Sequence, residues 1–210
     1  MTARVTSEPR HHGNRHGRSE EARIAVLEAA DDLLAERGFA GVTIEGIAAR
    51  AGVAKQTIYR WWDSKTAILF DALTEDAEEF FTAPDTGDLR GDLRVRLREV
   101  ATFLTTTDAG AVVRALLGQA QHDPAVAERL AAEFTARQHA LDAAVLLRAR
   151  ARGDLAPGTD IDLAIDRLAG PVYYRVLITG QAVPPAVTDA IVDAFLADRG
   201  SARQSRHAGT

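Results

Sequence analysis

The sequence of 210 residues contains no cysteine, which excludes disulfides, cysteine-ligated metals and thiol nucleophiles. Lysine is scarce as well, because Lys55 and Lys65 are the only two. No apolar run approaches the ~18 residues of a membrane span, and the polar, basic N-terminus lacks the apolar segment of a signal peptide. We therefore expect a cytoplasmic protein that needs neither a metal nor a cofactor.

Acidic residues outnumber basic ones, 30 against 25, and the net charge of −5 at first disfavours a nucleic-acid binder. The charge is unevenly distributed, however. Residues 1–66 hold ten basic and nine acidic side chains, whereas residues 67–200 hold 13 and 21. An acidic C-terminal part that stays away from DNA would leave the basic groups of the N-terminal part free to face phosphates.

Apolar residues recur at helical spacing along most of the chain, and no segment has the alternation and hairpin turns of a sheet. We expect an all-α protein of about nine helices, starting near residues 19, 43, 54, 64, 88, 109, 124, 160 and 185. The first should end at Gly38, and the seventh should run unbroken to about Arg150. The predicted organisation is a disordered basic arm over residues 1–18, a helix-turn-helix head over 19–66, a helical body over 67–199 and a loose tail over 200–210.

Residues Thr43 to Trp62 carry the pattern of a helix-turn-helix. Thr43 is a helix-capping residue, and the apolar residues after it lie on one helix face: Ile44, Ile47, Ala48 and Ala51. Gly52 supplies the left-handed conformation that the tight turn requires. The second helix begins near Lys55 and turns Ile58 and Trp62 inward. Its outward side has no core to serve, which is typical of a recognition helix in the major groove of DNA.

The outward residues of this second helix are of types that read DNA. Lysine and arginine reach guanine O6 and N7 or phosphates, glutamine bonds adenine, and the threonine methyl contacts thymine. We expect base contacts from Lys55, Gln56, Thr57 and Arg60, and phosphate contacts from Tyr59, Trp61, Thr43 and Lys65. For Tyr59 the alternative is that its ring packs on the first helix.

The same residues resemble those of the TetR family of bacterial transcriptional repressors. The matching motifs are Gly41-Val42-Thr43-Ile44, Ile47-Ala48, Ala51-Gly52-Val53, Thr57-Ile58-Tyr59 and Ser64-Lys65, and residues 168–175 look like the family's dimerisation helix. The sequence departs from the family's pattern at Ala54, where a capping serine is common. Trp62 replaces a usual phenylalanine, and Trp61 a usual tyrosine or histidine. The resemblance implies a repressor that a small-molecule ligand releases from its operator.

The last two predicted helices are apolar enough to serve more than one partner. We predict that they form a four-helix interface with a second copy of the chain, through Leu168, Val172, Val176, Val187, Ile191 and Phe195. The alternative is an ordinary pair of core helices. A symmetric dimer would place its two heads on half-sites of a near-palindromic operator about 34–36 Å apart.

The family resemblance also implies a pocket for the effector in the helices between residues 88 and 151. Candidate lining residues are Phe80, Phe103, Leu116, Phe134 and Tyr174. For each of them a plain core role is the favoured alternative. The sequence identifies no particular effector.

An enzyme is the main rival function, yet the sequence contains no glycine-rich phosphate loop, nucleophile elbow or His-Glu-x-x-His zinc motif. Three of the six histidines lie in the predicted arm and one in the predicted tail. A small-molecule-binding protein without DNA activity is the other alternative. We favour a homodimeric, sequence-specific DNA-binding regulator that is not an enzyme.

Overall fold

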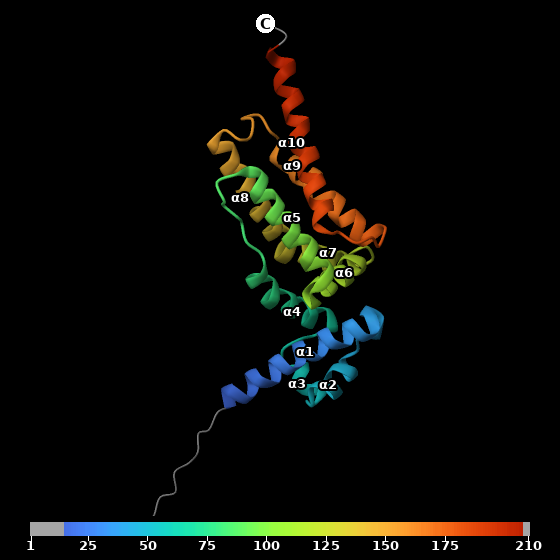
Figure 1. Cartoon of the computed structure of the whole chain (residues 1–210). Coiled ribbons are helices and arrows are strands. Elements are labelled where there is room, and N and C mark those ends of the chain that lie inside the picture. Colours follow the sequence, from blue (N-terminus) through green and yellow to red (C-terminus); the bar gives the residue numbers. More distant parts are fainter. Residues whose placement is uncertain (1–14, 208–210) are drawn as a thin grey trace, which may run out of the picture.

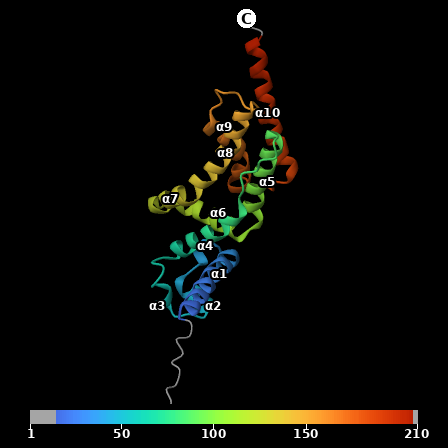
Figure 2. The same ribbon diagram turned by 90° about the vertical axis from the view of Figure 1, so that its left-hand side faces the viewer.

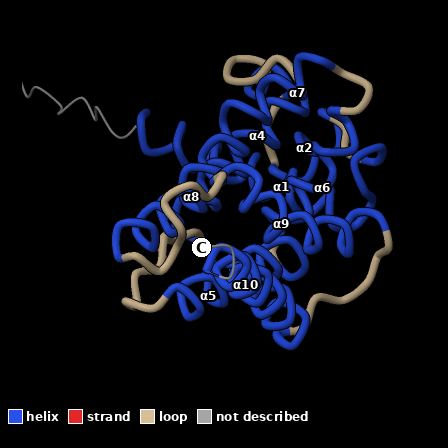
Figure 3. Tube along the Cα trace, turned by 90° about the horizontal axis from the view of Figure 1, so that it is seen from above, coloured by secondary structure: helices blue, strands red, loops and turns tan. Residues whose placement is uncertain are grey.

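The computed structural model describes the backbone of residues 15–207, and the side chains of this range except those of 15–18, 75–79 and 198–207. Every regular element in it is helical (Figure 3), so the predicted all-α fold is confirmed. The elements are α1 (Arg15–Gly41), α2 (Ile44–Ala51), α3 (Lys55–Ile58), α4 (Lys65–Phe80), α5 (Leu89–Thr106), α6 (Asp108–Ala120), α7 (Pro124–Leu130), the π-helical turn η1 (Ala131–Thr135), α8 (Ala136–Arg152), α9 (Ile161–Tyr173), the π-helical turn η2 (Tyr174–Ile178) and α10 (Pro185–His207).

The molecule is elongated, with two regions that α4 connects (Figure 1). Helices α1 to α3 form the head at one end, and α5 to α10 form the body. The last part of α10 extends away from the body on the side opposite the head, as the view in Figure 2 also shows. The head and the C-terminal end of α10 therefore lie at opposite ends of the molecule.

The head has an apolar core of its own. Helix α1 packs against α2 and α4. The side chains between these helices are almost completely buried, and they include Val26, Ala30, Leu33, Ile47 and Ile58. Burial of one large aliphatic side chain is worth about 1.5–3 kcal/mol. This core holds α2 and α3 in a fixed orientation.

Both terminal helices are longer than the sequence analysis predicted. Helix α1 begins at Arg15 and not at Ser19, and α10 continues to His207, through most of the predicted tail. Once a packed segment has nucleated a helix, each further residue is added at little cost. Helix α1 therefore extends beyond the predicted cap at Ser19. Residues 1–14 of the predicted arm and 208–210 of the predicted tail lie outside the described residues. Gly38 interrupts α1 as expected, with φ of 66°, but another helical turn follows it.

Two of the predicted helices contain a π-helical turn. The predicted seventh helix is α7, η1 and α8 in continuous succession, and the predicted eighth is α9 followed by η2. Counted in this way, the described residues form nine continuous helical segments, as the sequence indicated. A π-turn holds one more residue than an α-turn, so side chains after it face a different direction from the one that regular spacing predicts.

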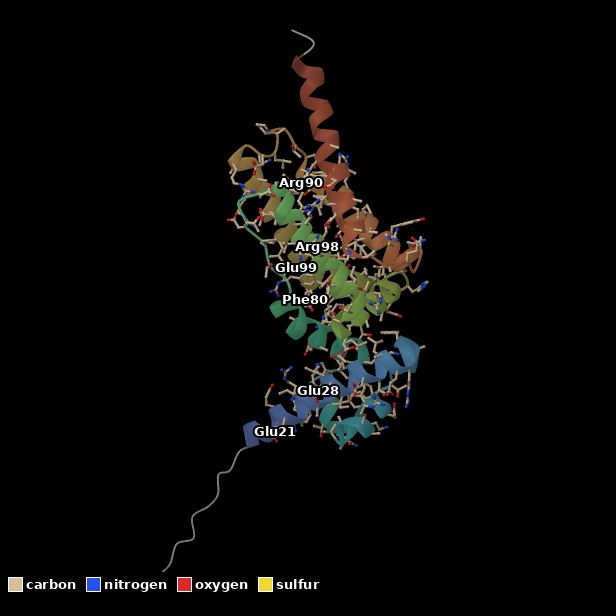
Figure 4. All side chains as sticks on the ribbon, viewed as in Figure 1. Glu21, Glu28, Phe80, Arg90, Arg98 and Glu99 are labelled. Atoms are coloured by element: carbon tan, nitrogen blue, oxygen red, sulfur yellow. The ribbon has the colours of Figure 1, made fainter. Side chains whose placement is uncertain are left out.

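Helix α10 lies against α5 through a row of surface ion pairs. Arg90 and Arg94 of α5 pair with Asp193, and Arg98 Nη2 lies 2.7 Å from Asp189 Oδ1. Figure 4 labels Arg90 and Arg98 on α5. Exposed pairs of this kind contribute little stability each. Their regular spacing of four residues on both helices sets the register of α10 on the body.

The connection between α4 and α5 is tied to α8 by two arginines. Arg148 Nη2 donates to the carbonyl oxygens of Ala83 and Pro84 at 2.9 and 2.7 Å. Arg152 Nη1 lies 3.2 Å from Asp85 in this connection, and its Nη2 lies 3.3 Å from Asp92 of α5, which is fully buried. Burial alone would raise the pKa of Asp92, but hydrogen bonds from Thr86 and Arg152 outweigh it and hold this pKa below its usual range.

Helices α5 and α6 meet at an angle of 81°, and the turn leaves no room for a side chain at Gly110. A Cβ atom there would lie 1.9 Å from the carbonyl oxygen of Phe103. Thr107 caps α6 by accepting a hydrogen bond from the Gly110 amide at 2.9 Å. No single helix in the described range is long and apolar enough to cross a membrane, although this bent pair passes on length and composition together.

Candidate nucleic-acid interface

The turn of the predicted helix-turn-helix has the expected geometry. Thr43 caps α2, because its Oγ1 accepts a hydrogen bond from the Gly46 amide at 3.0 Å. Gly52 ends α2 in the left-handed conformation, with φ of 68° and ψ of 27°. The Val53 amide then donates to the Ala48 carbonyl at 3.1 Å, which brings the chain directly into α3. The capping and turn residues named from the sequence are confirmed in these roles.

Helix α3 is shorter than predicted. It spans Lys55–Ile58, and the chain coils on through a turn in which the Trp62 amide donates to the Ile58 carbonyl at 3.0 Å. Ala54 at the N-cap makes no side-chain hydrogen bond, so the first turn lacks the cap that serine would provide. The polar residues of the predicted second helix therefore divide between α3 and the turn that follows it.

The inward side of this element is locked into the head. Ile58 and Trp62 are buried, as predicted. Trp62 Nε1 donates to Asp71 Oδ2 of α4 at 2.7 Å, which satisfies the buried indole N–H. Asp71 Oδ1 also accepts a hydrogen bond from Arg129 Nη2 of α7 at 3.4 Å. One carboxylate thus contacts the end of the helix-turn-helix and the body at the same time.

The outward side is exposed, as a groove-reading surface requires. The Tyr59 residue is 56% exposed, so the alternative of a ring packed on α1 is wrong. Gln56 and Arg60 are exposed as well, whereas Thr57 is half-buried. The half-buried Trp61 ring stands edge-on to Trp62, with ring centroids 5.4 Å apart.

Lys55 has a partner that the sequence analysis missed. Its Nζ lies 2.9 Å from Glu45 Oε1 on α2. The hydrogen bond with Glu45 raises the pKa of Lys55, and the same bond lowers the pKa of Glu45. Both side chains are exposed, so the pair is weak enough for Lys55 to exchange Glu45 for a base or a phosphate.

Lys65 occupies a different environment from the one predicted. Its Nζ donates to the carbonyl oxygens of Phe39 and Val42 at 2.7 and 3.0 Å. The ammonium also lies 4.2 Å from the centroid of the Phe39 ring. Burial lowers the pKa of Lys65. Lys65 therefore ties the start of α4 to the end of α1, and its phosphate contact stays a prediction.

The residues of the predicted dimer interface divide between the protomer's own core and an exposed groove, which Val187, Ile191 and Phe195 line. Leu168, Val172 and Phe195 are buried in the protomer's own core. Val176, Val187 and Ile191 are half-buried. The exposed large apolar side chains of α9 and η2 are Leu163, Tyr174, Leu177 and Ile178. Apolar residues on both sides of α9 made the outer side hard to distinguish from the inner one.

An open apolar groove of about 860 Å³ follows this outer side between α9–η2 and α10. Its lining includes Pro171, Tyr174, Val187, Ile191 and Ala194. The small residues Gly170 and Ala190 contribute to the same groove. A surface of this kind marks an interaction site on a folded protein.

The predicted pocket residues are core residues with one exception. Phe103, Leu116 and Phe134 are buried, and Phe80 is half-buried. Three phenylalanine rings surround that of Phe103, whose centroid lies 4.5 Å from that of Phe81, 5.3 Å from that of Phe80 and 5.9 Å from that of Phe134. The exception is Tyr174, which belongs to the exposed groove and is 58% exposed. Tyr174 follows Gly170 and Pro171 at regular helical spacing on the outer side of this segment, and the structure does not bring it together with the other predicted pocket residues.

Next to these rings lies a buried polar network that the sequence analysis missed. Arg96 of α5 is only 2% exposed, and its Nε donates to Asp142 Oδ1 at 2.7 Å. Arg96 Nη2 donates to Gln138 Oε1 at 2.6 Å. Burial raises the pKa of Asp142 against the opposing effect of Arg96. Burial raises the pKa of Tyr173 to about 12, and the negative charge of Asp142 acts in the same direction.

This geometry defines a helix-turn-helix protein of the kind that binds DNA. In the part of the chain that the structure describes, no group of three histidine, cysteine or acidic side chains is placed to hold a metal ion. Residues 26–72 match the family described as bacterial regulatory proteins, tetR family. Residues 83–195 match the tetracyclin repressor-like C-terminal domain. The chain belongs to the TetR family, whose members are transcription regulators and not enzymes.

Two relatives are similar over most of the chain. An uncharacterised HTH-type transcriptional regulator of Bacillus subtilis, YdeS, is 37% identical over 179 residues, which are 85% of this chain and 90% of that protein. The DNA-binding transcriptional repressor TetR of Mycobacteroides abscessus is 30% identical over 173 residues, 78% of this chain and 86% of that protein.

Two solved structures have the same fold. The TetR family transcription regulator SCO0332 is 38% identical, with a TM-score of 0.67 over 84% of this chain and 97% of that one. FadR from Bacillus subtilis, solved in complex with stearoyl-CoA, has a TM-score of 0.62 over 82% of this chain and 97% of that one. FadR is 20% identical to this chain, so this likeness concerns the fold.

Proposed function

We propose that the chain works in the cytoplasm as a homodimer that binds a near-palindromic operator, represses transcription there and leaves the DNA when a small molecule binds the body. The observation that carries the DNA-binding part is the row of exposed polar side chains on α3 and its following turn. The buried Ile58 and Trp62 hold this row in one orientation. Lys55, Gln56 and Arg60 are the side chains that we expect to meet base edges.

The partner in the dimer would be a second copy seated on the groove between α9–η2 and α10. Tyr174 of this groove is exposed in the single chain, as are Leu163 and Ile178 of the same helical segment, and pairing would remove their apolar surface from water. An interface of this kind is isologous, because the same helices of both copies face each other across a two-fold axis. The two heads would then reach two successive turns of one face of the duplex.

Release requires that the body act on the head, and Asp71 provides a direct path. It accepts hydrogen bonds from Trp62 of the head and from Arg129 of α7. A ligand that moved α7 would change the position of α4 and with it the support of Trp62. Such a ligand must bind the DNA-free state more tightly, and a change from 1:99 to 99:1 needs about 5.5 kcal/mol of differential affinity.

The experiment that tests the DNA-binding part selects bound sequences from a random duplex pool and then measures affinity on the selected operator. We expect Lys55→Ala and Gln56→Ala each to weaken operator binding by about 1–3 kcal/mol while random duplexes bind as before. Equal losses on the operator and on random DNA would show that these residues do not read bases.

Lys65→Ala serves as the matched comparison, because its ammonium also contacts the backbone of the head. If Lys65 binds a phosphate, the variant loses affinity for every DNA sequence. The slope of log affinity against log salt concentration then falls by about one, because one fewer counterion is released. If the salt dependence is unchanged and the thermal midpoint of unfolding falls, Lys65 stabilises the head and does not contact DNA.

A further inference from the structure

The buried network of Arg96, Asp142, Gln138 and Glu99 contains hydrogen-bond donors without an acceptor. Arg96 Nη1 and Gln138 Nε2 are both buried and form no hydrogen bond. Nη1 lies 3.7 Å from Glu99 Oε2, which is an ion pair without a hydrogen bond. A buried donor without an acceptor is unfavourable, so two of them in one network indicate a partner that binds there.

The orientation of the Gln138 amide follows from its neighbour. The Arg96 guanidinium can only donate, and its Nη2 lies 2.6 Å from the Gln138 side chain. The amide oxygen must therefore face Arg96, and the amide N–H₂ is the group left without a partner. Both unpaired groups of the network are thus donors, and the group that would satisfy them is an acceptor.

The charges around the guanidinium indicate which acceptor fits. Arg96 faces two carboxylates, Asp142 at 2.7 Å and Glu99 at 3.7 Å. One positive charge between two carboxylates leaves no net positive charge to attract an anion. The desolvation of a further anion would also be unfavourable. A neutral oxygen acceptor has neither disadvantage.

A small cavity lies beside Arg96 and Asp142, and Gln138 borders Arg96 outside the lining of this cavity. Arg96 and Asp142 form its polar wall, and the other lining residues are apolar: Leu93, Leu97, Val145, Leu146, Ile165, Leu168 and Ala169. Its volume of about 10 Å³ is enough for roughly one water molecule. A larger guest must push α8 or α9 outward, and the π-turn η1 interrupts the regular helix one turn before Gln138.

We propose that this cavity and network form the effector site, and that the effector is a neutral, mainly apolar molecule that presents a carbonyl-type oxygen to Arg96 and Gln138. The inference rests on the proposed function, since it names the ligand class of that regulation. The site also contacts the end of α4. The Arg96 guanidinium lies 4.9 Å from the Phe81 ring, and Glu99 accepts a hydrogen bond from Thr82 Oγ1 at 2.7 Å. Figure 4 labels Phe80 and Glu99 at this junction of α4 and α5.

The test titrates the full-length protein with three probes that share one ring: cyclohexanone, cyclohexanecarboxylate and cyclohexylammonium. Binding is followed by the side-chain NMR signals of Gln138 Nε2 and Arg96 Nε. We expect a saturable shift with cyclohexanone, with a Kd on the order of millimolar for so small a molecule. The carboxylate and the ammonium should bind at least ten-fold more weakly.

Two variants and one control assign the response to the site. Gln138→Met keeps the length of the side chain but removes the donor, and it should weaken cyclohexanone binding at least ten-fold. Ala169→Val fills the cavity without touching the network and should have the same effect. Gln181→Met, in an exposed loop, should bind like the parent. A folded Ala169→Val variant with parental affinity would overturn the assignment even if Gln138→Met failed to fold.

The remaining outcomes separate this inference from the proposed function. No saturable shift with cyclohexanone, or stronger binding of the carboxylate, would overturn the ligand class while operator binding stands. A cavity that only a water molecule occupies would overturn the site. Saturable cyclohexanone binding without any change in operator affinity would support the site and contradict release of the DNA by the ligand.

Discussion

The head and the body differ in where they keep their polar side chains. Among the described residues, the four buried polar or charged side chains are Asp92, Arg96, Gln138 and Thr188, and all of them lie in the body. In the head, Lys55 and Arg50 pair with acidic residues at the surface. A surface that reads DNA must exchange its partners easily, whereas a buried network responds to whatever enters beside it. The difference separates the region that recognises DNA from the region suited to sensing.

The largest expected effect comes from breaking the buried network. Arg96→Met leaves Asp142 in the core without its cation and should destabilise the protein by about 3–5 kcal/mol. Arg98→Met is the matched control, two residues along α5, where the exposed pair with Asp189 should be worth less than about 1 kcal/mol. Urea denaturation measures both variants, and similar losses for the two would erase the contrast between buried and exposed charges.

A second prediction concerns the sharp turn at the head side of the body. Gly110→Ala forces a methyl group against the Phe103 carbonyl and should cost about 1–3 kcal/mol through overpacking. Gly118→Ala lies on the same helix in open space and should stabilise it by up to about 1 kcal/mol. Thermal midpoints check the pair, and equal shifts for both variants would contradict the close approach.

A third prediction tests the contact that joins the two regions. Asp71→Ala leaves the indole N–H of Trp62 buried without an acceptor, at a cost of about 1–2 kcal/mol, and should weaken operator binding as well. Asp71→Asn retains an oxygen for Trp62 and should keep most of the stability. If both variants bound the operator like the parent, Asp71 would have no part in coupling the head to the body.

The sequence was most informative in the head. The cap at Thr43, the turn at Gly52 and the inward Ile58 and Trp62 follow from local rules, and the structure has all of them. The partners of Lys55 and Lys65 were not predictable in this way. Glu45 lies ten residues before Lys55, and the carbonyls that Lys65 contacts come from the far end of α1. Contacts of this kind depend on tertiary packing.

In the body the sequence predicted where the helices lie better than which side of each helix is buried. The helical segment of α9 and η2 is apolar on two sides, so the spacing did not show that Tyr174 lies on the outer side, in the exposed groove. Arg96 was missed for another reason. It stands among Arg90, Arg94 and Arg98, which reach the surface, and nothing in the spacing marks it as the buried member of the series.

If two copies of the chain read one face of a single duplex, the complex with the selected operator must contain both copies. Native mass spectrometry should find an even number of chains on each duplex. Insertion of five base pairs, about half a helical turn, between the half-sites should abolish specific binding. A single chain bound with full specificity, or an insertion without effect, would contradict the account.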